Sequence, residues 1–225
     1  MLRRPLILLS VLLAVLIFSW LRWRDERSRE QLAVSPAPEI LKLPVDFTNR
    51  TFDPAMPPAD MPPLAAGESA ECDSNFLSSA RVGGETRPTD ATHAAVTVTR
   101  IQVTLQLKIA IWTPADATRH LIEHEEGHRQ ISEYYYQTAE KVAERIAAPY
   151  LGKQVQITGA NLDAESTPLL QEMAHEITDE YNKELNPGPA QLLYDSITDH
   201  GRNGVASRDA AAHAIQNVAM ESNLR

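Results

Sequence analysis

The sequence predicts an α+β domain in which a small antiparallel sheet packs on a long helix and further helices. Two patterns carry this prediction. Apolar residues stand at every second position of residues 101–111, which is the period of a half-buried strand. Beyond residue 114 they recur at spacings of three, four and seven, as in a helix with one apolar face. The chain has 225 residues and is 43% hydrophobic, so it can bury such a core.

Residues 1–30 are predicted to form a membrane anchor with flanking charges. Residues 5–21 carry no charge, and at 1.5 Å per residue they would span about 25 Å as a helix. The run ends in Trp20-Leu21-Arg22-Trp23-Arg24, which is typical of a membrane interface and has no small-x-small cleavage site. We therefore expect a single-pass helix in a bacterial inner membrane with the domain in the periplasm. The alternative is a cleaved signal peptide and a secreted protein.

Residues 31–66 are predicted to be a Pro-rich linker that holds the domain off the membrane. Eight of the fifteen prolines fall between Pro36 and Pro63. Such a segment favours extended conformations and cannot supply the hydrogen bonds of a helix or a central strand. An arm packed along the domain is the alternative, and Phe47, Phe52 and Leu64 could anchor it. The domain itself would then occupy residues 67–225.

The remaining elements follow from local signals. Val96 and Val98 belong either to an earlier strand or to the strand at 101–111, separated from it by a bulge near Thr99. Thr113 suits an N-cap and Pro114 the first position of a helix. Three helices are expected, covering Thr113 to about Ala148, Ser166 to Leu185, and Gln191 to His200 with Gly201 as its cap.

Charge and cysteine content exclude several classes of function. The net charge is −9, and residues 1–30 contribute +3, which leaves −12 for the rest. A body this acidic repels phosphate backbones, so we expect no nucleic-acid partner. The single cysteine, Cys72, can form neither an intrachain disulfide nor a cysteine-rich zinc site. A bound metal would have to be held by histidines and carboxylates.

The pentapeptide His124-Glu125-Glu126-Gly127-His128 falls within the first predicted helix. Residues four apart on a helix project side by side, so the two imidazoles can bind one ion. Zn²⁺ with three protein ligands lowers the pKa of bound water to about 7. Glu125 could then take the proton of this water and pass it to a leaving amine. The pattern therefore predicts a zinc metallopeptidase with Glu125 as general base.

The third metal ligand must come from another segment. The extended motif with a third histidine is absent, because Glu133, Tyr134 and Tyr135 occupy the corresponding region. One source is His200, on the inward face of the third predicted helix. The residues alone leave this choice open, since the second helix also offers Glu172, His175, Glu176 and Asp179.

Gly127 is an unusual residue for the interior of this helix. Glycine costs about 1 kcal/mol relative to alanine in a helix interior. We therefore expect a close neighbour or a ligand at Gly127.

Three segments together resemble a known family. They are Trp112-Thr113-Pro114, His124 to Ile131, and Tyr194-Asp195-Ser196-Ile197-Thr198-Asp199-His200-Gly201. They look like the W-x-P, HE-x-GH and YD-x-x-T-x-HG patterns of the bacterial secreted zinc-dependent proteases catalogued as domain of unknown function 922. The resemblance covers roughly residues 70 to 210. It implies a zincin-like fold, makes His200 the preferred third ligand, and places Tyr194 and Asp195 in the site.

Physical chemistry suggests roles for the residues around this site. Asp195 or Asp199 would accept the second N–H of a ligand imidazole. Tyr194 would donate a hydrogen bond to the oxyanion of a tetrahedral intermediate, unless it is simply a core aromatic. The strand at 101–111 would lie along the cleft and pair with an extended substrate.

We therefore expect Zn²⁺-dependent hydrolysis of peptide or protein substrates in the periplasm. One alternative is a non-catalytic envelope protein with a structural or vestigial zinc site. The other is a zinc-dependent amidase that acts on the cell wall.

Overall fold

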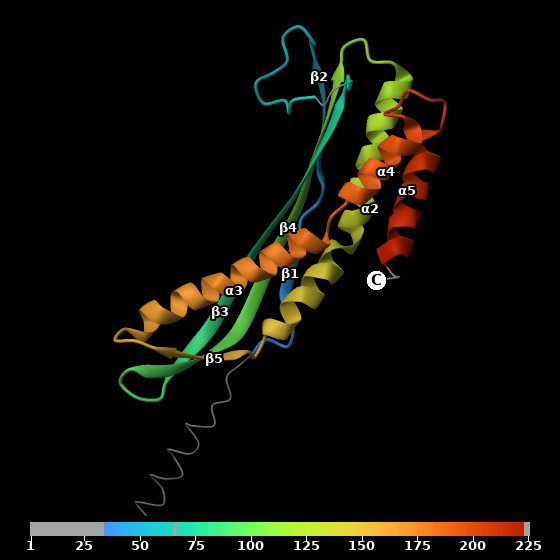
Figure 1. Ribbon diagram of the computed structural model, residues 1–225. Helices are drawn as coiled ribbons and strands as arrows, with labels where there is room; N and C mark the ends of the chain where they lie inside the picture. The colour runs from blue at the N-terminus through green and yellow to red at the C-terminus, as the bar shows by residue number, and fades with distance from the viewer. Residues whose placement is uncertain (1–33, 65–66, 223–225) are drawn as a thin grey trace, which may run out of the picture. The chain divides into compact units, whose positions relative to one another are not determined.

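The long strand β4 (His93–Pro114) is the centre of the sheet in the computed structural model, which describes residues 34–64 and 67–222 (Figure 1). On one side, β4 pairs antiparallel with β3 (Glu71–Pro88) along nearly its whole length. On its other side lie three shorter strands: β1 (Glu39–Lys42), β2 (Asp46–Phe52) and β5 (Gln154–Thr158). The described residues from Ser35 onward form one compact unit.

The sheet is mixed rather than antiparallel. The α+β class is confirmed, but β1 and β2 run parallel to β4, with Glu39 opposite Gln102 and Phe47 opposite Ile109. The prediction of a purely antiparallel sheet was wrong because both strands come from the segment assigned to a linker. Antiparallel pairing holds for β3 and β5 only.

The predicted linker at 31–66 is therefore also wrong over residues 39–52. The alternative of an arm packed along the domain describes this segment, since Phe52 is buried and Phe47 packs on the core. Its prolines stand at the strand ends, with Pro38 before β1, Pro44 between the strands and Pro54 after β2. At such positions the missing N–H removes no hydrogen bond from the sheet.

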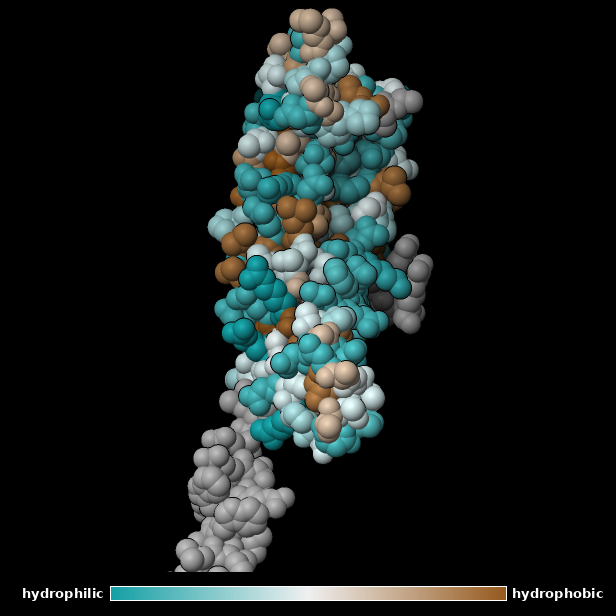
Figure 2. All heavy atoms as spheres, turned by 90° about the vertical axis from the view of Figure 1, so that its left-hand side faces the viewer, coloured by the Kyte–Doolittle hydropathy of each residue, from teal (hydrophilic) through white to brown (hydrophobic). Residues whose placement is uncertain are grey.

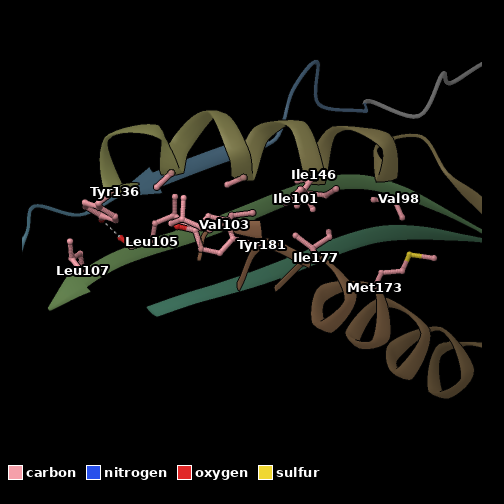
Figure 3. Packing of buried hydrophobic residues seen from close by; sticks show 14 of the residues in the cluster. Val98, Ile101, Val103, Leu105, Leu107, Tyr136, Ile146, Met173, Ile177 and Tyr181 are labelled. Atoms are coloured by element: carbon pink, nitrogen blue, oxygen red, sulfur yellow. Dashed lines mark hydrogen bonds between the residues drawn. The ribbon is translucent and has the colours of Figure 1, made fainter. Parts of the chain in front are cut away.

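One face of β4 supplies most of the core. Gly83 pairs with Arg100 and Gly84 with Val98, so Thr99 is the extra residue of a β-bulge, as predicted. Residues 94–98, before the bulge, are all buried, whereas from Ile101 to Ile111, after it, the buried positions are the odd-numbered ones. Side chains of β4 meet those of two helices there, α2 (Arg119–Ala147) and α3 (Leu162–Glu184) (Figure 3). The hydroxyl of Tyr136 on α2 also donates to the Leu105 carbonyl at 3.0 Å.

Helix α2 begins later than predicted. Thr113 and Pro114 continue β4, where they pair with Thr51 and Phe52 of β2. The true N-cap is Thr118, whose hydroxyl accepts from the Leu121 N–H at 3.2 Å. The C-terminal end agrees with the prediction, because a 3₁₀ turn, η1 (Ala148–Tyr150), follows directly.

Two further helices pack against α2. Helix α4 (Gly188–Thr198) and helix α5 (Ser207–Ser222) form a second apolar cluster with Ile131 of α2 (Figure 1). Helix α4 ends two residues before the predicted His200. Asp199, His200 and Gly201 all have left-handed φ angles, of 49°, 53° and 71°. The turn lies against α2, since a Cβ atom at Gly201 would come within 2.8 Å of the His124 ring.

The predicted anchor at residues 1–30 lies outside the described residues. Among the described residues, no helix combines the length and the apolar character needed to cross a bilayer. Figure 2 shows one face of the molecule, where hydrophilic residues dominate and hydrophobic ones are scattered between them. This face is suited to contact with water.

Candidate metal centre

Three side chains that can bind a metal ion converge between α2 and α4. The Nε2 atoms of His124 and His128, one helical turn apart, lie 3.3 Å from each other. The Oδ1 atom of Asp195, from α4, lies 2.9 Å from Nε2 of His128 and 3.5 Å from Nε2 of His124. Within the described part of the chain these are the residues that form a potential metal-binding group.

The geometry of this group fits a tetrahedral ion. Two nitrogen ligands at the usual Zn–N distance are about 3.3–3.4 Å apart in a tetrahedral site. Asp195 Oδ1 is buried and makes no well-aligned hydrogen bond within the described residues, although two imidazole nitrogens lie close to it. A buried carboxylate oxygen without a hydrogen bond is costly, and a cation shared with both imidazoles would compensate that cost. The donor set of two imidazoles and a carboxylate also suits Zn²⁺.

The charges of these groups favour a cation. Burial disfavours the ionised form of Asp195, but the neighbouring His124 and His128 outweigh it and hold the pKa of this carboxyl below its usual range. Burial likewise opposes the charged form of His128, and Asp195 reverses the balance and raises the pKa of its imidazole. A metal ion would replace the proton that these groups share.

Glu125 lines the same pocket but is not part of the ligand group. Its side chain is buried, with 4% of the residue exposed. Burial raises the pKa of its carboxyl to about 8, although His128 acts in the opposite direction. A carboxylate with a raised pKa can accept and release a proton near neutral pH, as a general base must.

The pocket above these residues has a volume of about 860 Å³. Its walls come from the first turns of α2, the first residues of β3, helix α4 and the left-handed turn after α4. Glu68 and Glu71 also line the pocket. A cavity of this size is within the range of ligand-binding sites.

Tyr194 lies beneath the metal group instead of facing a substrate. It is 0% exposed, its ring stacks on that of His124 with centroids 5.0 Å apart, and its hydroxyl donates to the His124 carbonyl at 2.9 Å. The predicted oxyanion role is therefore wrong, and the core-aromatic alternative describes the residue. A Cβ atom at Gly127 would overlap the Tyr194 hydroxyl, which confirms the close neighbour expected at this glycine.

His200 and Asp199 lie at the edge of the site. The Nδ1 atom of His200 is 3.9 Å from Asp195 Oδ1 and 3.6 Å from Glu68 Oε1, and its side chain is 44% exposed. His200 is thus near the ligand group without belonging to it. The carboxylate of Asp199 is 61% exposed and pairs with Arg202 at 3.0 Å, so the prediction that it supports a ligand imidazole was wrong.

The ligand candidates on α3 are far from this group. The carboxylate of Glu176 accepts a hydrogen bond from the Tyr150 hydroxyl at 3.0 Å. Tyr150 follows the C-terminal end of α2, roughly 30 Å along the helix from His128 at 1.5 Å per residue. None of the four candidates, Glu172, His175, Glu176 and Asp179, belongs to the metal-binding group found in residues 34–64 and 67–222.

Gln191 is a site residue that the sequence analysis missed. Its side-chain Oε1 lies 2.6 Å from Nδ1 of His128, across 63 positions of the chain. The available signal was its spacing, since Gln191 and Asp195 are four residues apart on one face of α4. Glutamine carries no metal-binding motif of its own, so this spacing gave no reason to select it.

The comparisons with known proteins give no match. No protein-family model matches the chain, and neither a curated protein nor a solved structure does.

Proposed function

We propose that this protein is a zinc-dependent peptidase that hydrolyses peptide bonds in peptide or protein substrates. The observation that supports it most is the convergence of His124, His128 and Asp195 in a pocket that Glu125 also lines. This combination provides ligands for one ion and a buried base beside it. The zincin-like assignment of the fold is part of the same proposal, since the edge strand β3 and the motif-bearing helix α2 border one pocket.

The ligands in this proposal are His124, His128 and a third residue from the α4 region. Asp195 is the better third ligand, because its Oδ1 lies within 3.5 Å of both Nε2 atoms. His200, which the family resemblance implies, has its nearer nitrogen 3.9 Å from Asp195 Oδ1. Three protein ligands leave a position open for water, as in catalytic zinc sites.

Glu125 has the central chemical role. A bound Zn²⁺ supplies Lewis acidity, which promotes deprotonation of water and polarises a substrate carbonyl. Glu125 takes up the proton and delivers it to the nitrogen of the leaving amine. Its burial in the pocket keeps the carboxyl in the range where both transfers are feasible. Tyr194 supports His124 from below and does not touch the reacting atoms.

An extended substrate would pair with β3. The proposal that residues 101–111 align the substrate fails, because β4 is paired on both sides. Within the described residues β3 pairs with β4 alone, so its outer edge is available where Cys72 and Ser74 line the pocket. Farther along, the Ala80 N–H on this edge already donates to Thr178 of α3 at 3.2 Å. A peptide could therefore add to the first residues of β3.

The location of the protein belongs to the proposal as well. Residues 5–21 carry no charge and are followed by tryptophans and arginines, which supports an inner-membrane anchor with the domain in the periplasm. The acidic remainder of the chain gives no support to nucleic-acid binding.

The test compares the full-length protein with its Glu125→Gln variant. The variant should keep its zinc, measured by elemental analysis, and lose peptide hydrolysis by about 100-fold or more. Glu126→Gln is the matched control, because the Glu126 carboxylate pairs with Arg129 at 2.5 Å instead of lining the pocket. Full hydrolytic activity in Glu125→Gln would refute the proposed mechanism.

A structural zinc site is the second candidate function. His200 Nδ1 is near enough to Asp195 that both could bind with the two α2 histidines, which would close the coordination sphere. This alternative predicts that Glu125→Gln changes nothing measurable, while His124→Ala lowers the melting temperature. Hydrolysis of cell-wall amides and not of peptides would instead identify an amidase with the same site.

A further inference from the structure

Gln191 is bound to the motif helix through both ends of its side-chain amide. Its Oε1 lies 2.6 Å from Nδ1 of His128. Its Nε2 donates to the His128 carbonyl at 3.1 Å and to the Ser132 hydroxyl at 3.0 Å. Ser132 is fully buried, and its hydroxyl also donates to Ser74 of β3 at 2.9 Å. The amide is therefore held between α4, α2 and the sheet.

This pattern of partners fixes which way the amide points. The His128 carbonyl can only accept a hydrogen bond, so the NH₂ group of Gln191 must face it. The carbonyl oxygen of the amide then faces Nδ1 of the imidazole. Since this oxygen can only accept, Nδ1 of His128 must carry the hydrogen. With a hydrogen on Nδ1, it is Nε2, the atom that faces His124 and Asp195, that can bind a metal ion once it gives up the proton that it shares with the Asp195 carboxylate.

We infer that Gln191 is a positioning residue that holds His128 in the Nδ1–H tautomer required for metal binding through Nε2. This inference rests on the proposed zinc site for its purpose, but the hydrogen that Gln191 holds on Nδ1 is already a property of the metal-free protein. Free histidine prefers the opposite tautomer, so the protein must supply the bias. Partners of this kind typically change metal affinity by about 10–100-fold.

The two ligand histidines are held by different means. Nδ1 of His124 is buried and has no hydrogen-bond partner among the described residues. Its ring is instead held by stacking on Tyr194. Loss of the Gln191 amide should therefore affect His128 and leave His124 in place.

The test measures the tautomer and the zinc affinity of the full-length protein in parallel. Long-range ¹H–¹⁵N NMR of metal-free, ¹⁵N-histidine-labelled protein shows whether Nδ1 of His128 carries a hydrogen, independently of a proton shared between Nε2 and Asp195. Gln191→Leu keeps the size of the side chain and removes the amide. It should shift His128 to a mixture rich in Nε2–H and weaken zinc binding by about 10–100-fold. Gln171→Leu, at an exposed position of α3, should change neither quantity.

A second variant covers the case in which Gln191→Leu does not fold. Gln191→Glu keeps an acceptor for Nδ1–H and loses the two donors, so His128 should retain its tautomer while the melting temperature falls. A hydrogen held on Nδ1 of His128 in Gln191→Leu as firmly as in the wild type, or the absence of a hydrogen from Nδ1 in the wild type, would overturn the inference. If the wild type shows the expected tautomer and binds no zinc, the proposed function fails and the inference on Gln191 stands.

Discussion

The hydroxyl of Tyr194 occupies the space that a side chain at Gly127 would need. Through this close approach Tyr194 reaches across the motif helix and donates to the His124 carbonyl at 2.9 Å. The same helix, α4, carries Asp195 and Gln191, so the separation between α4 and α2 determines the geometry of all three contacts to the histidines. A glycine within the motif thus positions residues from a segment some seventy positions away.

Gly127→Ala should consequently damage the metal site as well as the fold. A methyl group at this position forces Tyr194 and α4 away from α2, and overpacking of this kind costs about 1–3 kcal/mol. Chemical denaturation should show that loss of stability, and zinc affinity should fall with it. Gly204→Ala is the control, because no atom lies within 4 Å of a Cβ there. Wild-type stability and zinc affinity in Gly127→Ala would contradict the role assigned to this contact.

The start of helix α2 gives a second prediction. Thr118→Ala removes the hydroxyl that accepts from the Leu121 N–H, which should cost about 1 kcal/mol of unfolding free energy. Thr118→Ser keeps the hydroxyl and should retain most of that stability. Thermal or urea unfolding measures both. An equal loss in the two variants would mean that the methyl group of Thr118, and not its cap, is what matters.

Local patterns predicted the parts of the fold that depend on local periodicity. The strand around Leu105 and the bulge at Thr99 follow from the alternation of apolar residues. The start of α2 was misplaced because Thr113-Pro114 is compatible with both a helix start and a strand end. Thr113 and Pro114 belong to the strand because they pair with Thr51 and Phe52 of β2. The local sequence contains no information on this pairing. The parallel strands β1 and β2 were missed for the same reason.

In the candidate site, too, local spacing predicted some residues, whereas others depend on tertiary packing. His124 and His128 were predicted because a spacing of four on one helix brings two side chains together without any tertiary knowledge. Asp195 was expected to support an imidazole, and it lies close enough to both rings to be a ligand candidate itself. Gln191 acts across 63 positions and has no sequence signature. Its role depends on how α4 packs on α2.

Cys72 provides a probe of the pocket wall. It is the only cysteine of the chain, and burial strongly raises the pKa of its thiol. The thiol is therefore neutral at pH 8, whereas reaction with disulfide reagents requires the thiolate. Labelling of the folded protein should be more than about tenfold slower than labelling of the same protein in denaturant. Equal rates would show that the Cys72 side chain is not shielded in the pocket wall as described.

The identity of the third ligand can be decided by two substitutions. Asp195→Asn keeps the size of the side chain and removes its charge, whereas His200→Ala removes a partly exposed ring. Because Asp195 Oδ1 is within 3.5 Å of both Nε2 atoms, Asp195→Asn should weaken zinc binding by about 100-fold or more, and His200→Ala by much less. Competition with a chromogenic chelator measures both affinities.

Each pattern of loss has a defined meaning for the coordination sphere. Loss in His200→Ala alone would assign the third position to His200 and return Asp195 to a supporting role. Loss in both variants would indicate four protein ligands, the arrangement of a structural site, and hydrolysis should then be absent from the wild type. Loss in Asp195→Asn alone leaves one position open for water beside Glu125. A peptidase requires that only one of the two variants loses zinc affinity, since one coordination position then stays open for water. The two affinities therefore test the proposed function before any substrate is known.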